Sequence, residues 1–123
     1  MPKTRVVFFR EEDGKVPFLD WLDQQPEKAQ DKCVVRLDLL RGMGHELRRP
    51  HADFLRDGIY ELRIDLQGIH YRILYFYHGN IAIVVSHGVV KSQTVPGAEI
   101  DRVLRRKGMF ARNPERHTYE EDL

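Results

Sequence analysis

The sequence predicts a small, single α+β domain with the element order β-α-α-β-β-β-α, in which a helical hairpin and a C-terminal helix pack on a mainly antiparallel sheet. Three observations predict this class. The length of 123 residues, 41% of them hydrophobic, suits one domain with one packed core. Apolar residues recur at helical spacing over residues 16–42, whereas the period changes to two from residue 60. Glycine-containing turns then separate three strand-like runs, which is typical of an antiparallel meander.

The first half of the chain predicts one strand and two helices. Residues 4–9 are rich in β-branched and aromatic side chains and end at a charged turn, so they predict the first strand. Pro17 suits the first turn of a helix that should stop near Pro26. Pro26 can open the next helix, whose apolar positions share one face up to about Gly42 or Gly44. Two short antiparallel helices joined at a proline would form the helical hairpin.

The second half predicts the meander and one more helix. Residues 45–58 are polar and irregular, and we expect a loop there. In residues 60–66 apolar and polar side chains alternate, which predicts a strand with one polar face. Residues 69–77 and 81–87 are apolar on both faces, as expected for central strands covered on both sides. The last helix should cover about residues 98–109.

Residues 1–112 should form the folded domain, and residues 113–123 a polar acidic tail. No apolar run approaches the ~20 residues of a membrane span, and the N-terminus has no signal-peptide pattern. Cys33 is the single cysteine, which excludes an internal disulfide and a cysteine-based zinc cluster, and it falls on the apolar face of a helix. These features predict a soluble cytoplasmic protein with no membrane partner.

The charge is segregated along the chain, although the formal net charge is only +1. Residues 11–31 hold seven acidic residues against two lysines, whereas residues 41–112 hold twelve basic residues against seven acidic ones. Affinity for a polyanion depends on the local potential, so a near-neutral total is compatible with a basic face that binds nucleic acid. Mixed charges that only solubilise a small domain are an equally good interpretation of the charges alone.

The sequence contains none of the common phosphate-loop, zinc-protease or serine-hydrolase motifs. Its six histidines show no close ligand spacing, so we expect no metal and no cofactor. A cationic set remains as the candidate site: Arg63 on the polar face of the strand at 60–66, Arg72 in the next strand, and His87 and Lys91 at the end of the third. Arginine binds phosphate bidentately and histidine transfers protons near neutral pH, but each arginine is as well explained by a carboxylate partner. The loop before these strands adds Arg48, Arg49, His51 and Arg56.

Four short motifs follow one another along the second half of the chain. Residues 57–63 read Asp-Gly-Ile-Tyr-Glu-Leu-Arg and residues 71–75 read Tyr-Arg-Ile-Leu-Tyr. Residues 87–96 carry a His-Gly-Val-Val-Lys motif, and residues 99–102 begin the last helix with Glu-Ile-Asp-Arg. The order of these motifs resembles the RelE/ParE toxin superfamily, and its phage-derived HigB-like branch more closely. The resemblance is collinear over residues 4–112 and implies a RelE-like fold.

The resemblance implies the toxin of a type II toxin–antitoxin system, a ribosome-dependent, metal-independent endoribonuclease that cleaves mRNA by attack of the 2′-hydroxyl on the scissile phosphate. The partners would be mRNA, the ribosome and a helix-turn-helix antitoxin. Arg63 would stabilise the phosphate, with Arg72 as a second candidate. His87 would act in proton transfer, and Lys91 would stabilise charge or bind the RNA backbone. The binding residues for RNA would be Arg48, Arg49, His51 and Arg56.

Departures from the family pattern leave two alternatives open. Asp53 and Phe54 occupy a stretch where the family commonly has lysine, Ser92 replaces one of two paired lysines, and Phe110 stands near the place of a tyrosine. These departures favour a non-catalytic relative that binds RNA or an antitoxin. A gyrase-inhibiting ParE-like toxin is the third interpretation, since fold alone does not determine function. The acidic residues 11–31 are either a solvated helix face, which we prefer, or an antitoxin-facing surface.

Overall fold

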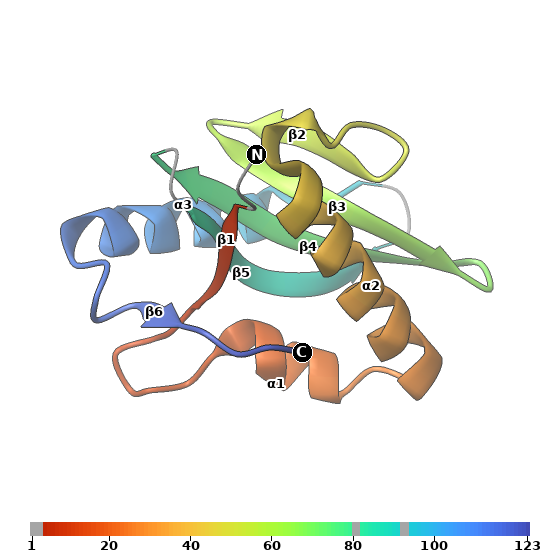
Figure 1. Cartoon of the computed structure of the whole chain (residues 1–123), viewed down its shortest axis with the longest axis horizontal. Helices are drawn as coiled ribbons and strands as arrows, with labels where there is room; N and C mark the ends of the chain where they lie inside the picture. The colour runs from red at the N-terminus through yellow and green to blue at the C-terminus, as the bar shows by residue number, and fades with distance from the viewer. Residues whose placement is uncertain (1–3, 80–81, 92–93) are drawn as a thin grey trace.

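The computed structural model describes residues 4–79, 82–91 and 94–123, so the predicted strand start at Ile81 and the motif residue Ser92 lie outside the described residues. The elements, in chain order, are β1 (Arg5–Phe9), α1 (Pro17–Asp23), α2 (Glu27–Met43), the short 3₁₀-helix η1 (Gly44–Glu46), β2 (Ala52–Arg56), β3 (Ile59–Leu66), β4 (Ile69–His78), β5 (Ala82–Lys91), α3 (Gly97–Arg112) and β6 (Thr118–Tyr119) (Figure 1). None of the described helices is long and apolar enough to cross a membrane.

One sheet with the strand order β2-β3-β4-β5-β1-β6 forms the centre of the fold. Strands β3 to β5 form the expected three-strand antiparallel meander, and β2, which was not expected, pairs antiparallel with β3 at its edge. Strand β1 runs parallel to β5, with Arg5 opposite Ala82, and β6 pairs antiparallel with β1. A small α+β domain with a mainly antiparallel sheet is therefore confirmed.

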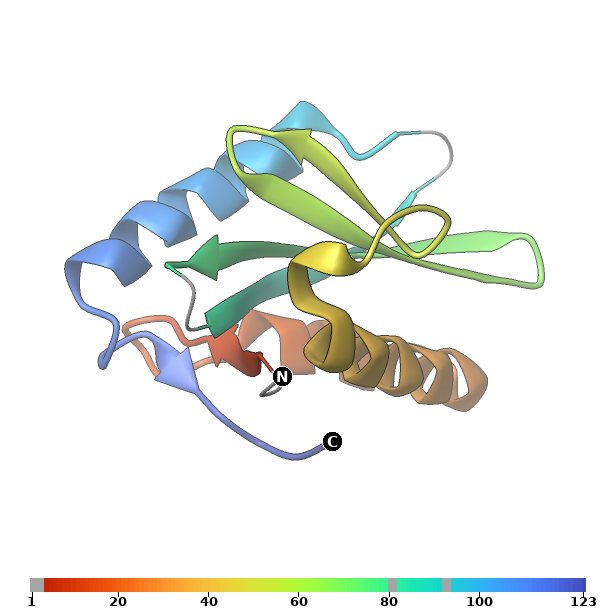
Figure 2. The ribbon, with the colours of Figure 1, turned by 45° about the horizontal axis from the view of Figure 1, so that its top comes forward.

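Helices cover both faces of the sheet. Figure 2 shows α1 and α2 on one side and α3 on the other. Consecutive residues of β4 enter different cores, because side chains alternate across a strand: Ile73 packs with the residues of α1 and α2, and Leu74 packs with those of α3. Cover on both faces explains why β4 and β5 carry apolar side chains on both faces, as the sequence predicted.

The region expected to be a polar loop contains η1 and the edge strand β2. Helix α2 ends at Met43. The next residue, Gly44, has a φ of +55°, which suits glycine, and an added Cβ there would lie 2.8 Å from the hydroxyl oxygen of Thr4. Strand β2 then pairs with β3, although its Asp53 and the nearby Pro50 are unusual in strands. Strand β5 also extends to Lys91, where it still pairs with β4, and the Trp21 ring packs on its backbone at Gly88.

Two further expectations differ from the structure. The helices α1 and α2 run obliquely to each other in Figure 1 and do not form the expected antiparallel hairpin. The segment after α3 is not a wholly solvated tail, since Thr118 and Tyr119 extend the sheet. His117 is buried, stacks on Phe9 with ring centroids 5.0 Å apart, and its Nδ1 lies 2.8 Å from the Arg10 carbonyl oxygen.

Candidate functional site

The polar face of β3 and β4 brings two of the predicted site residues together. Arg63 and Arg72 are directly opposite each other in the register of the two strands. Both approach the same carboxylate: Arg63 Nε lies 3.8 Å from Glu61 Oε2, and Arg72 Nε lies 3.7 Å from Glu61 Oε1. The side chains therefore share one face of the sheet, the face that α3 covers further along. Together with Asp65 and Lys91, these three residues are called the Arg63 cluster below.

Arg72 is the buried member of the Arg63 cluster. Its side chain is 2% exposed and that of Glu61 is 6% exposed. Arg72 Nη1 donates to Asp65 Oδ1 and to the carbonyl oxygen of Tyr71, each at 2.9 Å. A buried charge of this kind needs such partners, because its desolvation is otherwise uncompensated. Because the side chain of Arg72 is buried and its Nη1 already donates within the protein, a phosphate at the surface would meet other groups.

Arg63 and Lys91 are the cluster's solvent-accessible cations. The Arg63 side chain is 27% exposed, and among the described residues its Nε has no hydrogen-bond acceptor. Lys91 on β5 lies opposite His70 on β4. Burial lowers the pKa of the Lys91 amine, and the positive charges of Arg72 and Arg63 lower it further against the opposing charge of Glu61. Lys91 therefore releases a proton more readily than an ordinary lysine.

Asp65 and His70 complete the rim of this face. His70 Nδ1 lies 2.6 Å from Asp65 Oδ1. Although burial acts to raise the pKa of Asp65, the hydrogen bonds from His70 and Arg72 hold it below its usual range. Sequence reasoning placed Asp65 and Glu61 on the polar face but missed that they bind Arg72. Aligning residues 60–66 with residues 69–77 across the tight turn would have predicted that Arg72 lies on the same face as these two carboxylates.

His87 lies apart from the Arg63 cluster, beneath α3. Its Nδ1 lies 2.9 Å from Arg106 Nη1, and its Nε2 lies 3.0 Å from Glu99 Oε1. A guanidinium can only donate, so Nδ1 accepts and the neutral ring carries its proton on Nε2, toward Glu99. Burial, followed by the positive charge of Arg106, lowers the pKa of His87 to about 4. Both ring nitrogens are thus occupied by α3, and the predicted role in proton transfer stays a prediction.

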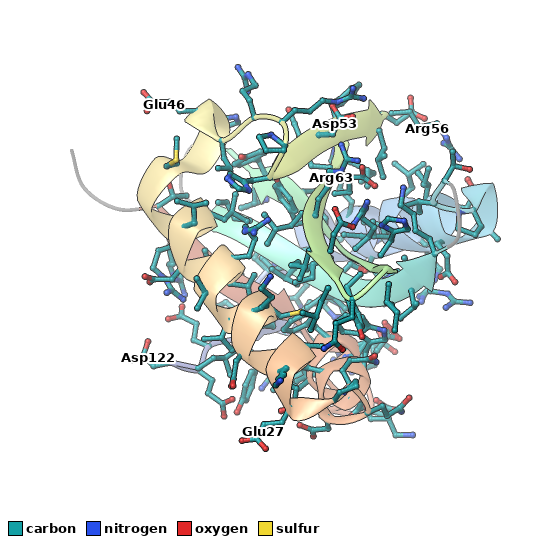
Figure 3. All side chains as sticks on the ribbon, turned by 90° about the vertical axis from the view of Figure 1, so that its right-hand side faces the viewer. Glu27, Glu46, Asp53, Arg56, Arg63 and Asp122 are labelled. Carbon is teal, nitrogen blue, oxygen red and sulfur yellow. The ribbon has the colours of Figure 1, made fainter. Side chains whose placement is uncertain are left out.

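The four predicted RNA-binding residues contact different partners. Arg49 donates to Asp53 Oδ2 from Nε at 3.0 Å and from Nη2 at 2.7 Å. Arg56 lies further along β2 (Figure 3) and pairs with Asp57 at 2.9 Å and Asp101 of α3 at 2.7 Å. His51 contributes its carbonyl oxygen, which accepts from the Arg63 backbone N–H at 2.8 Å. Arg48 remains exposed and donates to the His45 carbonyl oxygen.

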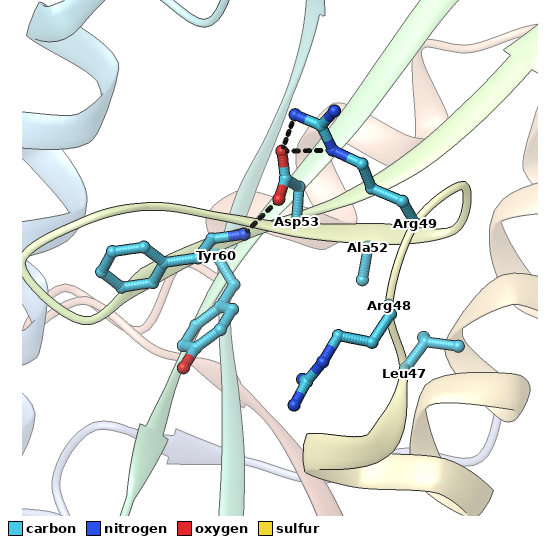
Figure 4. Close-up of a pocket in the computed structure, with 7 residues that line it drawn as sticks. Leu47, Arg48, Arg49, Ala52, Asp53 and Tyr60 are labelled. Atoms are coloured by element: carbon cyan, nitrogen blue, oxygen red, sulfur yellow. Dashed lines mark hydrogen bonds and ion pairs between the residues drawn. The ribbon is translucent and has the colours of Figure 1, made fainter.

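A pocket of about 530 Å³ lies beside β2, and Figure 4 shows Arg48 extending along it. The lining residues are Leu47, Arg48, Arg49, Ala52, Asp53, Phe54 and Tyr60. Tyr60 belongs to a ring cluster on the α2 side of the sheet, in which it stacks on Tyr75 at 5.5 Å between centroids. Burial raises the pKa of the Tyr77 hydroxyl in this cluster to about 12, so the Tyr77 side chain stays neutral near pH 7.

The fold and the Arg63 cluster define a small α+β protein with a cationic sheet face. Residues 20–108 match the family model described as Phage derived protein Gp49-like (DUF891). The chain therefore belongs to the Gp49-like family of phage-derived proteins, a family in the RelE-like toxin group. No curated protein matches the sequence.

Proposed function

We propose that this chain is the toxin of a type II toxin–antitoxin pair of the HigB-like branch, which acts in the cytoplasm, cleaves mRNA on the ribosome without a metal or cofactor, and is held by a helix-turn-helix antitoxin. The observation that carries the proposal is the placement of Arg63 and Lys91, both partly exposed, on one face of the sheet of a Gp49-like fold. A guanidinium whose Nε has no hydrogen-bond acceptor among the described residues, near a lysine of lowered pKa, suits reactions at a phosphodiester.

The proposed reaction is attack of the RNA 2′-hydroxyl on the neighbouring phosphorus. A bond forms between O2′ and phosphorus, the bond to O5′ breaks, and the products are a 2′,3′-cyclic phosphate and a 5′-hydroxyl. Water takes up the proton that leaves O2′, and a second proton reaches O5′. Arg63 would stabilise the charge on the non-bridging oxygens, and Lys91 would supply the proton to O5′. Arg72 and Glu61 act as positioning residues, because Glu61 lies within 4 Å of both guanidinium groups.

Induced expression in a bacterial host, with mapping of new mRNA 5′ ends, tests the proposal. The parent chain should arrest growth and produce cuts in translated messages. Arg63→Ala should remove both effects, since one lost charge-stabilising donor costs about 10²–10³ in rate. Arg116→Ala is the matched control, because this exposed arginine pairs only distantly with Glu12, at 3.9 Å. Growth arrest without any new mRNA ends would contradict the proposal.

A non-catalytic relative is the second candidate, and two observations favour it. Phe110, which stands near the family's tyrosine, is 2% exposed and packs against Phe76 with ring centroids 6.0 Å apart. His87 is enclosed by α3 rather than presented beside Arg63. In a purified translation reaction this candidate would bind ribosomes or an antitoxin and leave the message intact. Site-specific cleavage that Lys91→Met abolishes would exclude it.

A further inference from the structure

We propose that the pocket beside β2 is a stacking site for one base of single-stranded RNA, with Phe54 as the platform and Arg48 as the contact to a neighbouring phosphate. The inference deepens the proposed function and rests on it for the identity of the nucleic acid. It concerns residues that lie outside the Arg63 cluster and on the opposite face of the sheet.

Phe54 is the first reason for this assignment. Phe54 is 53% exposed on an edge strand, where contact of its apolar ring with water is unfavourable. The ring lies edge-on to Tyr60, with centroids 5.2 Å apart and planes at 70°, and Tyr60 is itself held by Tyr75. An exposed aromatic face fixed by a second ring is the arrangement on which bases of single strands stack, and such stacking tolerates any base.

The charge of the pocket favours a nucleotide over an apolar peptide side chain. Arg48 is exposed, and none of the carboxylates in the described ranges pairs with it. Its guanidinium is therefore available to a phosphate, in the bidentate geometry that arginine offers. The pocket volume of about 530 Å³ lies within the range of small-ligand sites.

The pocket and the Arg63 cluster are linked through Asp53 of the edge strand β2. Asp53 lines the pocket and lies directly opposite Glu61 in the register of β2 and β3. Figure 3 shows Asp53 and Arg63 close together. The hydrogen bond from Arg49 lowers the pKa of Asp53, and the charge of Arg63 acts in the same direction. A strand whose phosphate meets Arg63 would thus reach the pocket by turning around this edge.

The test is fluorescence anisotropy of the purified chain with a labelled ten-nucleotide single-stranded RNA, in the absence of ribosomes. Phe54→Leu keeps an apolar side chain and removes the ring, so it should weaken binding about tenfold, within the range measured for loss of one base–aromatic stack. Phe54→Trp should restore binding. Val35→Ala is the matched control, because Val35 is an exposed apolar residue (68%) on α2 that does not line the pocket.

An abasic ribose-phosphate oligomer of the same length separates stacking from charge. Phe54→Leu should bind this oligomer as the parent does, whereas Arg48→Gln should bind both oligomers more weakly. The inference would be overturned if Phe54→Leu lost the same affinity for both oligomers, or if the parent chain did not bind RNA. The second outcome would indicate that the pocket binds a protein partner instead. Arg63→Ala should retain the Phe54-dependent binding while losing mRNA cleavage, so failure of the proposed function is distinguishable from failure of this site.

Discussion

Replacement of Arg72 by methionine should lower the free energy of unfolding, because Arg72 has a structural role and does not contact RNA directly. The pair between Arg72 and Glu61 is buried, and at 3.7 Å it corresponds to about 4.5 kcal/mol at an effective dielectric constant of about 20. Removing one partner of such a pair leaves the other charge uncompensated and usually costs about 3–5 kcal/mol. Because Arg63 remains 3.8 Å from Glu61, we expect the lower end, about 3 kcal/mol. The pair with the half-exposed Asp65 adds less than about 1 kcal/mol.

Urea unfolding followed by Trp21 fluorescence measures this change, since Trp21 is the single tryptophan and packs on the sheet. A loss of about 3 kcal/mol should lower the melting temperature by roughly 10–15 °C in a domain of this size. The double variant Glu61→Gln with Arg72→Met should recover part of the loss, because the stranded charge is gone. The control Arg116→Met should change the free energy by less than about 1 kcal/mol. If Arg72→Met were as stable as the parent yet abolished growth arrest, the structural role of Arg72 would be refuted in favour of direct contact with RNA.

Three further predictions concern stability and reactivity. Gly88→Ala should lower the free energy of unfolding by about 1–3 kcal/mol and change the Trp21 emission, because the added Cβ would lie 2.3 Å from ring carbons of Trp21; unchanged emission would argue against this contact. Burial lowers the pKa of His87 to about 4, below the value of about 6.5 in the unfolded chain. The neutral form of His87 therefore stabilises the fold by up to roughly 3 kcal/mol above pH 6.5, and this contribution should be lost as the pH falls from 6.5 to 4. The loss should be absent from His87→Gln in urea titrations across that range, and an equal acid sensitivity of both chains would contradict it. Burial raises the pKa of Cys33 to about 11, so the thiol should resist a disulfide reagent at pH 8 and react once urea unfolds the chain; rapid labelling without urea would show that the α2 face opens.

The sequence was sufficient for the central strands and the three helices, because their apolar residues either follow helical spacing or form nearly continuous runs bounded by turn residues. It was insufficient for β2, where a five-residue edge strand carries Asp53 and follows Pro50, so local composition favoured a loop. It was also insufficient for β6, whose two residues are held by pairing with β1 rather than by their own propensity. Short edge elements depend on contacts with distant residues, and these are invisible to a local pattern.

The candidate site was predictable in part for a similar reason. Alternation along β3 put Glu61 and Arg63 on one face, and pairing across the turn adds Arg72. The alternation does not show how deeply each side chain is buried. It does not reveal that Glu61 as a whole residue is only 4% exposed or that Arg72 is buried beside it, because burial depends on how α3 and the neighbouring strands cover that face. The separation of His87 from Lys91 has the same origin, because α3 covers only the first part of β5's polar face.

The sheet order has a consequence for how the molecule assembles and opens. Strands β2 to β5 are joined by short turns, whereas Arg5 of β1 pairs with Ala82 across most of the chain. During folding, strand pairs between residues that are distant in the sequence form late, because closing a long loop costs more entropy. The meander should therefore form first, and β1, with β6 on its outer side, should join last. The same edge should open first in hydrogen exchange, since β6 holds β1 through only two residues. Because β2 forms the opposite edge of the sheet, fraying at β6 would leave the Arg63 cluster and its neighbouring pocket intact.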